Sequence, residues 1–223
     1  MKIKICGVTN EEDVRLISDA GADYLGLLLD VPSPRSLTLE RVEGLSKISR
    51  VPVVILFSDA ETEKIQKAVE RIRPYAIQLQ GNESPEVISN LRKYVTTEIW
   101  KALHFPAQGD GIVPIEEVKH KMKEYAEAGS DKIILDTVVV REGKREQGGT
   151  GKTHDWGLAE ELAALSAVPV FLAGGLNPEN VCEAIEKVQP YGVDLSSGVE
   201  KSVGKKDPQK VRTFIKRVRE WIE

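Results

Sequence analysis

Apolar and polar positions follow two alternating periods along the whole chain. Short apolar runs rich in Val, Ile and Leu are bounded by Gly, Pro, Asp or Ser, which is typical of buried strands. Between these runs, longer stretches carry apolar residues at helical spacing. The eight predicted strands are Ile3–Cys6, Tyr24–Leu29, Val53–Phe57, Ala76–Leu79, Glu98–Ala102, Lys132–Asp136, Val170–Ala173 and Gly192–Ser196.

A predicted helix follows each of these strands. The eight stretches are Glu11–Ala20, Leu39–Ile48, Glu61–Arg71, Pro85–Tyr94, Pro114–Ala128, Trp156–Leu165, Pro178–Val188 and Pro208–Ile222. Strict alternation of strand and helix predicts parallel strands with right-handed crossovers. Eight units in 223 residues fit a closed ring better than an open sheet. We therefore predict the α/β class, as a single-domain (β/α)8 TIM barrel over residues 1–223.

The residues at the ends of the predicted helices agree with this pattern. Two predicted helices end at Ala-Gly pairs, Ala20–Gly21 and Ala128–Gly129, where Gly can take the left-handed conformation of a helix C-cap. The longest irregular stretch, 137–155, follows the sixth strand and has a Gly-rich second half. Long loops in compact domains often bind or cover ligands. We expect this loop to lie at the C-terminal face of the barrel, where it could close over a ligand.

Composition narrows the function classes. Hydrophobic residues make up 41% of the chain and the net charge is −4, with acidic and basic residues interspersed. No basic stripe suggests a nucleic-acid partner. Cys6 and Cys182 are too few for a disulfide framework, which favours a reducing compartment. No apolar run reaches membrane-spanning length, and the N-terminus does not resemble a signal peptide. We expect a cytoplasmic protein without a membrane partner.

The seventh and eighth strands both end in very small residues. Gly174–Gly175 follows one, and Ser197–Gly198 follows the other. Small residues leave backbone N–H groups accessible to a phosphate, because no Cβ stands in the way. Loops after strands seven and eight form the recurrent phosphate site of (β/α)8 barrels. The sequence therefore predicts a phosphorylated small-molecule ligand held by these four residues.

Two residues at strand ends are candidates for acid–base chemistry. Cys6 ends the first strand, and it could equally be a small buried residue or a reactive group. Asp136 ends the sixth strand, where a buried carboxylate needs a partner or a function. Two strands separate the first from the sixth around the ring, so the side chains could face each other across the mouth. A thiol and a carboxyl placed in this way can act as base and acid.

Two further charged residues lie near the same end. Arg35 follows Ser33–Pro34 in the loop after the second strand. It could be a solvated surface residue or a fork-shaped clamp for a substrate carboxylate. Asp194 lies inside the eighth apolar run and shares one face of that strand with Ser196. It could contact a ligand or hold neighbouring structure in place.

The order of these motifs resembles the phosphoribosylanthranilate isomerase family of tryptophan biosynthesis. The resemblance extends from end to end. It rests on Lys4–Thr9, Gly21–Asp23, Ser33–Arg35, Gln78–Gly81, Asp136–Thr137, Gly148–Lys152, Asp155–Trp156, Leu172–Val181 and Gly192–Glu200.

This resemblance implies an Amadori rearrangement of N-(5-phosphoribosyl)anthranilate to its 1-deoxyribulose form. It makes Asp136 the general acid and Cys6 the general base. Arg35 would hold the anthranilate carboxylate, and Gln80 and Asp194 would bind substrate. The reaction needs no metal or cofactor, because the substrate amine serves as the electron sink. The resemblance leaves open whether the protein is a homodimer or a monomer.

The chain departs from the family pattern at several positions. Gln80 stands where the family usually has His in a Gln-Leu-His-Gly motif, and Leu27–Leu29 replace an aromatic-rich segment. Asp30 adds a carboxylate after these leucines. The loop 137–155 is also longer and more charged than the family pattern. Two alternatives follow: a paralogue that isomerises another phosphorylated aminosugar, and a non-catalytic phosphosugar-binding protein.

Overall fold

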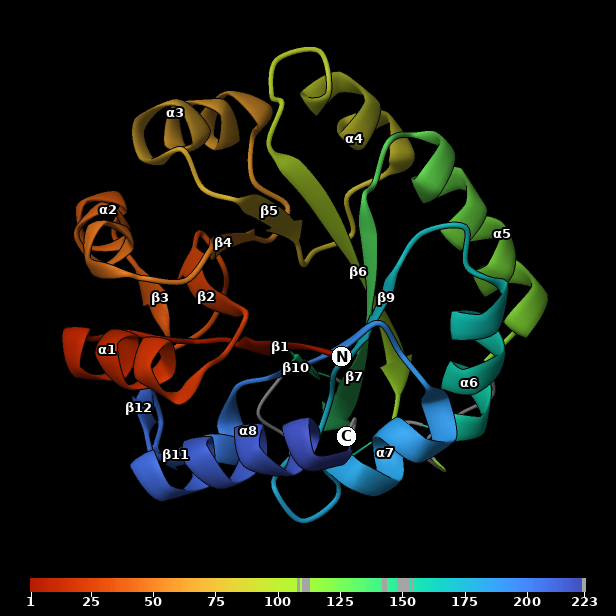
Figure 1. Cartoon of the computed structure of the whole chain (residues 1–223). Coiled ribbons are helices and arrows are strands. Elements are labelled where there is room, and N and C mark those ends of the chain that lie inside the picture. Colours follow the sequence, from red (N-terminus) through yellow and green to blue (C-terminus); the bar gives the residue numbers. More distant parts are fainter. Residues whose placement is uncertain (108, 110–112, 142–143, 148–152, 154, 222–223) are drawn as a thin grey trace.

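The computed structural model describes residues 1–107, 109, 113–141, 144–147, 153 and 155–221, with only the backbone described for 138–141 and 144–147. Eight parallel strands close into a barrel because the first strand pairs with both the last and the second. Figure 1 shows these strands inside a ring of helices. The strands are β1 (Lys2–Ile5), β2 (Tyr24–Leu29), β4 (Val53–Phe57), β5 (Ala76–Leu79), β6 (Glu98–Pro106), β7 (Lys132–Arg141), β9 (Val170–Leu172) and β10 (Gly192–Leu195).

In the described part of the chain, eight helices surround this barrel, one after each barrel strand. They are α1 (Glu11–Ala20), α2 (Leu39–Ile48), α3 (Thr62–Ile72), α4 (Pro85–Leu91), α5 (Ile115–Glu127), α6 (Trp156–Leu165), α7 (Val181–Val188) and α8 (Pro208–Trp221). The predicted fold class is confirmed, and the bounds of α1, α2 and α6 match the sequence pattern. Among the described residues, no helix has the length and apolar character needed to cross a membrane.

Local chemistry explains where helices begin and end. The Asn10 side chain accepts a hydrogen bond from the Asp13 N–H and caps the start of α1. Gly21 ends that helix in the left-handed conformation, with φ 89°. Asp155 caps α6 by accepting hydrogen bonds from the N–H groups of Gly157 and Leu158. These caps set the points at which the chain turns back toward the sheet.

The expected irregular loop 137–155 is only partly irregular. Strand β7 continues past Asp136 to Arg141 and pairs antiparallel with β8 (Lys144–Gln147). The prediction of a loop from residue 137 onward was therefore wrong for this first half. The consecutive residues Val138, Val139 and Val140 suit a strand, because β-branched residues favour extended backbone. The Gly-rich half, 148–152, lies outside the described residues.

Besides β8, four short elements were not predicted. Strand β3 (Ser36–Leu37) pairs with the end of β2. The 3-10 helix η1 (Ser197–Val199) follows β10, and it leads into a hairpin of β11 (Glu200–Ser202) and β12 (Lys205–Lys206). Figure 1 shows this hairpin beside α8 and below α1. It places charged residues next to the loops at the barrel mouth.

The apolar core has two parts, because strand side chains alternate between two faces. A large outer part fills the space between strands and helices. A smaller inner part fills the barrel itself and includes Tyr24, Trp100 and Phe171. The rings of Trp100 and Phe171 stack with centroids 5.1 Å apart, and Tyr24 meets Trp100 edge-on. A Cβ on Gly192 would lie 2.4 Å from Phe171, so only glycine leaves room for this ring.

Truncating the inner core should destabilise the whole barrel. We expect Phe171→Ala to lower the free energy of unfolding by about 3–5 kcal/mol, because it leaves a cavity under Trp100. Urea unfolding followed by circular dichroism measures this change. Leu165→Ala, at a side chain that is 62% exposed, is the matched control, with an expected change within about 0.5 kcal/mol. A loss below about 1 kcal/mol for Phe171→Ala would contradict this packing role.

Candidate active site

All the residues selected from the sequence line a single pocket at the C-terminal end of the barrel strands. The structure brings together Cys6, Arg35, Gln80, Asp136, Gly174, Gly175, Asp194, Ser197 and Gly198. They come from the ends of six strands and the loops after them. Because the strands are parallel, their carboxyl ends meet at one rim of the barrel. The pocket thus combines two potential proton-transfer groups, a cationic fork and a glycine-lined end.

Cys6 and Asp136 occupy opposite sides of this pocket. Between their strands, β1 and β7, lie β10 and β9, as the ring order requires. Both side chains belong to inward-facing positions, since Cys6 packs with the inner core and Ile134 precedes Asp136 on the same face of β7. Both residues are also almost completely buried. A ligand between them would therefore meet the thiol on one side and the carboxyl on the other.

The surroundings of Cys6 affect the acidity of its thiol. Burial raises the pKa of Cys6, and the positive charges of Lys4 and Lys206 act against that rise without cancelling it. The backbone N–H of Cys6 donates to the Leu195 carbonyl at 2.8 Å. A Cβ on Gly26 would lie 2.7 Å from the Cys6 sulfur, so a glycine at this position leaves room for the thiol. The free protein thus holds a thiol that ionises less readily than an ordinary one.

Asp136 is held by hydrogen bonds on both carboxylate oxygens. The Thr137 N–H donates to Oδ1 at 2.8 Å, and the Gln80 amide donates to Oδ2 at 2.9 Å. Gln80 is in turn oriented by Gln78, whose Nε2 donates to Gln80 Oε1 at 2.6 Å. This chain of amides runs along one inward face of β5 and the loop after it. Gln80 therefore contacts the candidate acid directly, which sequence reasoning did not anticipate.

His104 also lies beside this carboxyl. It is directly opposite Asp136 in the register of β6 and β7, and its Nδ1 is 3.9 Å from Asp136 Oδ2. The Gln80 carbonyl lies 2.7 Å from His104 Nε2 and can only accept, so Nε2 carries the proton. Buried Nδ1 has no hydrogen-bond partner among the described residues. The sequence pattern did not reveal the place of His104, because the predicted fifth strand ended at Ala102 whereas β6 continues to Pro106.

Lys4 and Asp194 form an ion pair inside the barrel. The Lys4 Nζ is 2.6 Å from Asp194 Oδ2, and the Lys4 side chain is completely buried. Burial alone lowers the pKa of Lys4, but the charges of Asp194 and Cys6 outweigh it and raise the pKa overall. Asp194 Oδ1 is buried and, within the described part of the chain, has no hydrogen-bond partner. Asp194 thus both anchors Lys4 and keeps one oxygen toward the pocket.

The same reasoning that singled out Asp194 could have found Lys4. Both are charged residues within a short apolar run, and Lys4 lies between Ile3 and Ile5. Their partnership depends on strands that are far apart in the sequence. Only the parallel pairing of β1 with β10 places Lys4 opposite Asp194.

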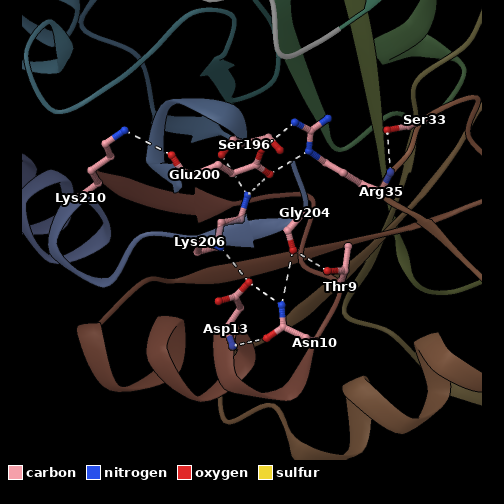
Figure 2. A network of polar contacts seen from close by, with 10 residues as sticks. All are labelled: Thr9, Asn10, Asp13, Ser33, Arg35, Ser196, Glu200, Gly204, Lys206 and Lys210. Atoms are coloured by element: carbon pink, nitrogen blue, oxygen red, sulfur yellow. Dashed lines mark hydrogen bonds and ion pairs between the residues drawn. The ribbon is translucent and has the colours of Figure 1, made fainter. Parts of the chain in front are cut away.

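Arg35 is largely, though not fully, buried at the pocket wall rather than solvated. Its Nε and Nη2 donate to the two carboxylate oxygens of Glu200 at 2.8 and 2.7 Å. Glu200 also accepts from Lys206 Nζ at 3.1 Å. Figure 2 shows this network and its continuation to α1. Sequence analysis missed both partners, because they belong to the unpredicted hairpin β11–β12.

The glycine-lined end of the pocket has little space for side chains. Gly174 and Gly175 adopt positive φ values of 84° and 67°. A Cβ on Gly174 would lie 2.1 Å from Thr137 Oγ1, and one on Gly198 would lie 1.9 Å from the Leu176 carbonyl. Ser197 and Gly198 open η1, and the first N–H groups of a helix have no partner within it. These features fit a cradle for an oxyanion.

The leucines at the end of β2 contribute less to the pocket than the sequence suggested. Side chains alternate along β2, so Leu28 lines the pocket while Leu27 and Leu29 pack in the outer core. Val31 and Leu56 complete an apolar wall with Leu28. Asp30 turns away from this wall, since its Oδ2 accepts from Lys64 Nζ at 2.7 Å on the surface. The extra carboxylate therefore does not enter the site.

Comparison with known proteins agrees with this geometry. The family model described as N-(5'phosphoribosyl)anthranilate (PRA) isomerase matches residues 3–217. A protein of Methanocella arvoryzae named N-(5'-phosphoribosyl)anthranilate isomerase is 39% identical over 222 residues, or 98% of each chain.

Solved structures are similar over 99% of both chains. One contains monomers generated from a dimeric phosphoribosylanthranilate isomerase of Thermotoga maritima, with a TM-score of 0.79 and 32% identity. Another is a phosphoribosylanthranilate isomerase in complex with reduced 1-(o-carboxyphenylamino)-1-deoxyribulose 5-phosphate, with a TM-score of 0.80 and 30% identity.

The ionisation of Cys6 can be measured directly. In a Cys182→Ser protein, we expect the rate of Cys6 alkylation by iodoacetamide to rise with pH. Its midpoint should lie above that of a free thiol, about 8.5, because burial raises the pKa of Cys6. Mass spectrometry of quenched samples gives the rate, and Cys6→Ser/Cys182→Ser gives the background. A midpoint below the value for a free thiol would contradict the burial argument.

Proposed function

The chain belongs to the N-(5'-phosphoribosyl)anthranilate isomerase family, and on that premise we propose that Cys6 and Asp136 are its general base and general acid. The enzyme converts N-(5-phosphoribosyl)anthranilate to 1-(2-carboxyphenylamino)-1-deoxyribulose 5-phosphate in tryptophan biosynthesis. The observation that carries the assignment is the placement of one thiol and one carboxyl on opposite sides of a single pocket.

The phosphate orients the substrate in this proposal. Backbone N–H groups surround it at one end of the pocket, and they belong to Gly174, Gly175, Ser197 and Gly198. The apolar wall of Leu28, Val31 and Leu56 receives the aromatic ring at another side. Because both ends of the substrate are held, the ribose between them lies within reach of both proton-transfer groups. Such positioning replaces a bimolecular encounter and accounts for part of the rate.

Asp136 begins the reaction. It gives its proton to the ribose ring oxygen as the C1′–O bond breaks, and the nitrogen lone pair forms the C=N bond. Gln80 and the Thr137 N–H hold the carboxyl in one orientation throughout and stabilise the carboxylate that forms. His104 lies beside this carboxyl, with its unprotonated Nδ1 3.9 Å from Asp136 Oδ2.

Cys6 completes the transfer as a thiolate. It removes the C2′ proton, and the electrons of that C–H bond form the C1′=C2′ bond while the nitrogen regains its lone pair. Tautomerisation of the resulting enol gives the ketone. The developing positive charge on the C=N nitrogen favours the thiolate, as do the ammonium groups of Lys4 and Lys206. One proton leaves Asp136 and one arrives at Cys6, so the charge of the pair is unchanged.

Asp194 and Arg35 complete the substrate contacts. Asp194 Oδ1 accepts from a ribose hydroxyl, which would satisfy an oxygen that lacks a partner within the described residues. Arg35 binds the anthranilate carboxylate. The enzyme works in the cytoplasm, where its two free cysteines remain reduced. A homodimer and a monomer both fit the chain, and the Thermotoga maritima relative is described as dimeric.

Turnover tests the proposal as a whole. Purified enzyme should remove the fluorescence of freshly prepared N-(5-phosphoribosyl)anthranilate. We expect Cys6→Ser to lower kcat by about 10²–10⁴-fold, because a serine hydroxyl is a much weaker base. Binding of the reduced product analogue should stay within about threefold of wild type, since Cys6 is not among the groups proposed to anchor the substrate. Near-normal turnover by Cys6→Ser would remove Cys6 as the base.

Gln80 provides a separate test of the acid. Replacing it as Gln80→Met removes the hydrogen bond to Asp136 Oδ2 but keeps the side-chain length. We expect kcat to fall about tenfold or more, because the carboxyl loses its orientation, while KM changes little. Steady-state kinetics separates the two parameters. A rise in KM with unchanged kcat would instead assign Gln80 to substrate binding.

A further inference from the structure

We propose that Glu200 positions Arg35 and thereby sets the preference of the enzyme for a substrate that carries a carboxylate. This inference rests on the proposed function, in which Arg35 is the carboxylate clamp. Glu200 does not itself contact the substrate in this scheme. It is a positioning residue that acts through the guanidinium.

The contact between Glu200 and Arg35 uses one edge of the guanidinium. Nε and Nη2 each donate to a different oxygen of the carboxylate. The Arg35 side chain is 12% exposed and the Glu200 side chain 5%, so water competes little for these bonds. Two parallel charge-assisted hydrogen bonds fix the plane of the group as well as its position. Arg35 is therefore held in one orientation before any ligand arrives.

The other edge of the guanidinium remains available. Arg35 has five N–H groups, and Glu200 occupies one on Nε and one on Nη2. Figure 2 shows the remaining terminal nitrogen pointing away from Glu200. The edge formed by Nη1 and the second N–H of Nη2 can thus receive a second carboxylate in the same bidentate manner. One arginine can hold Glu200 and the substrate at once.

Glu200 is itself fixed by neighbours that do not touch Arg35. Lys206 Nζ donates to Glu200 Oε1 at 3.1 Å and to the Ser196 carbonyl at 2.9 Å. The Lys206 backbone N–H donates to Asp13 Oδ2 at 3.0 Å, which ties the hairpin to α1. Lys210 Nζ donates to the Glu200 carbonyl at 3.2 Å. The carboxylate is therefore a rigid support for Arg35.

The position of Arg35 matters because its side chain packs against Gly7, the residue that follows Cys6. A Cβ on Gly7 would lie 2.7 Å from Arg35 Cδ and 2.4 Å from Ser196 Oγ. Gly7 has φ 71°, so a glycine is needed there for both backbone and space. In the substrate, the carboxylate is ortho to the amine nitrogen, which is bonded to C1′, and the proton is lost from the next carbon, C2′. Holding that carboxylate beside Cys6 brings the reacting carbon toward the thiolate.

Charge and position predict opposite effects of removing Glu200. Burial raises the pKa of Glu200, but the hydrogen bonds from Arg35 and the charge of Lys206 outweigh it and lower the pKa overall. The residue is therefore a carboxylate at neutral pH. Neutralising it makes the pocket more positive, which by charge alone would tighten binding of an anion. If orientation dominates, binding of the carboxylate weakens instead.

The experiment compares two ligands within each variant. Calorimetry measures Kd for the reduced product analogue with its carboxyphenyl group, and for the same compound with a plain phenyl group. We expect Glu200→Gln to weaken binding of the carboxyphenyl compound about tenfold and of the phenyl compound less than twofold. Lys201→Met, at an exposed position of the same strand β11, should keep the wild-type ratio of Kd for the phenyl compound to Kd for the carboxyphenyl compound.

Two backgrounds make the result decisive. In the Arg35→Ala protein, adding Glu200→Gln should not change this ratio of Kd values any further. Glu200→Asp keeps the charge but shortens the side chain, and it should lower the ratio partially; it also replaces Glu200→Gln if that variant does not fold. A ratio unchanged or increased in the Glu200 variants overturns the inference. A wild-type protein without preference for the carboxyphenyl compound would refute the proposed clamp itself, whatever Glu200 does.

Discussion

The site depends on the pairing of β1 with both β10 and β2, which closes the barrel. This pairing places Lys4 opposite Asp194 and brings Cys6 to the rim. A shift of one residue would turn every side chain of β1 to the other face, because strand positions alternate. The buried Lys4–Asp194 pair opposes such a shift, since breaking it would leave a charge unpaired inside the barrel. The register between β1 and β10 therefore determines where the Cys6 thiol lies.

Charges inside this barrel form linked groups rather than isolated residues. Near one wall, Arg35, Glu200 and Lys206 share hydrogen bonds; near the opposite wall, amides and an imidazole surround Asp136. Buried polar groups are costly unless each has partners, so these networks must form together with the fold. Two of the oxygens without partners among the described residues, Asp194 Oδ1 and Ser196 Oγ, belong to residues that line this pocket. Binding a polar ligand there satisfies them.

The difference at Gln80 illustrates how much depends on neighbours. In the sequence it is a substitution of a histidine expected from the family, and it suggested a changed substrate. In the structure its amide donates to Asp136, and a histidine on the adjacent strand, His104, lies beside the same carboxyl. The local chemistry around the acid is thus shared by two strands. A motif confined to one strand cannot show such a combination, because the second residue lies 24 positions away.

The sequence by itself determined the barrel, most element bounds and the residues that line the mouth. Periods of two and 3.6 residues follow from backbone geometry, and strand ends of a parallel barrel meet at one rim, so Cys6, Arg35, Asp136 and the glycines could be found from pattern and motif. Only the tertiary structure decided which charges are partners. Lys4 with Asp194 and Arg35 with Glu200 are separated by 190 and 165 positions. Their contacts depend on register around a closed ring and on a hairpin of five described strand residues, which local periodicity does not encode.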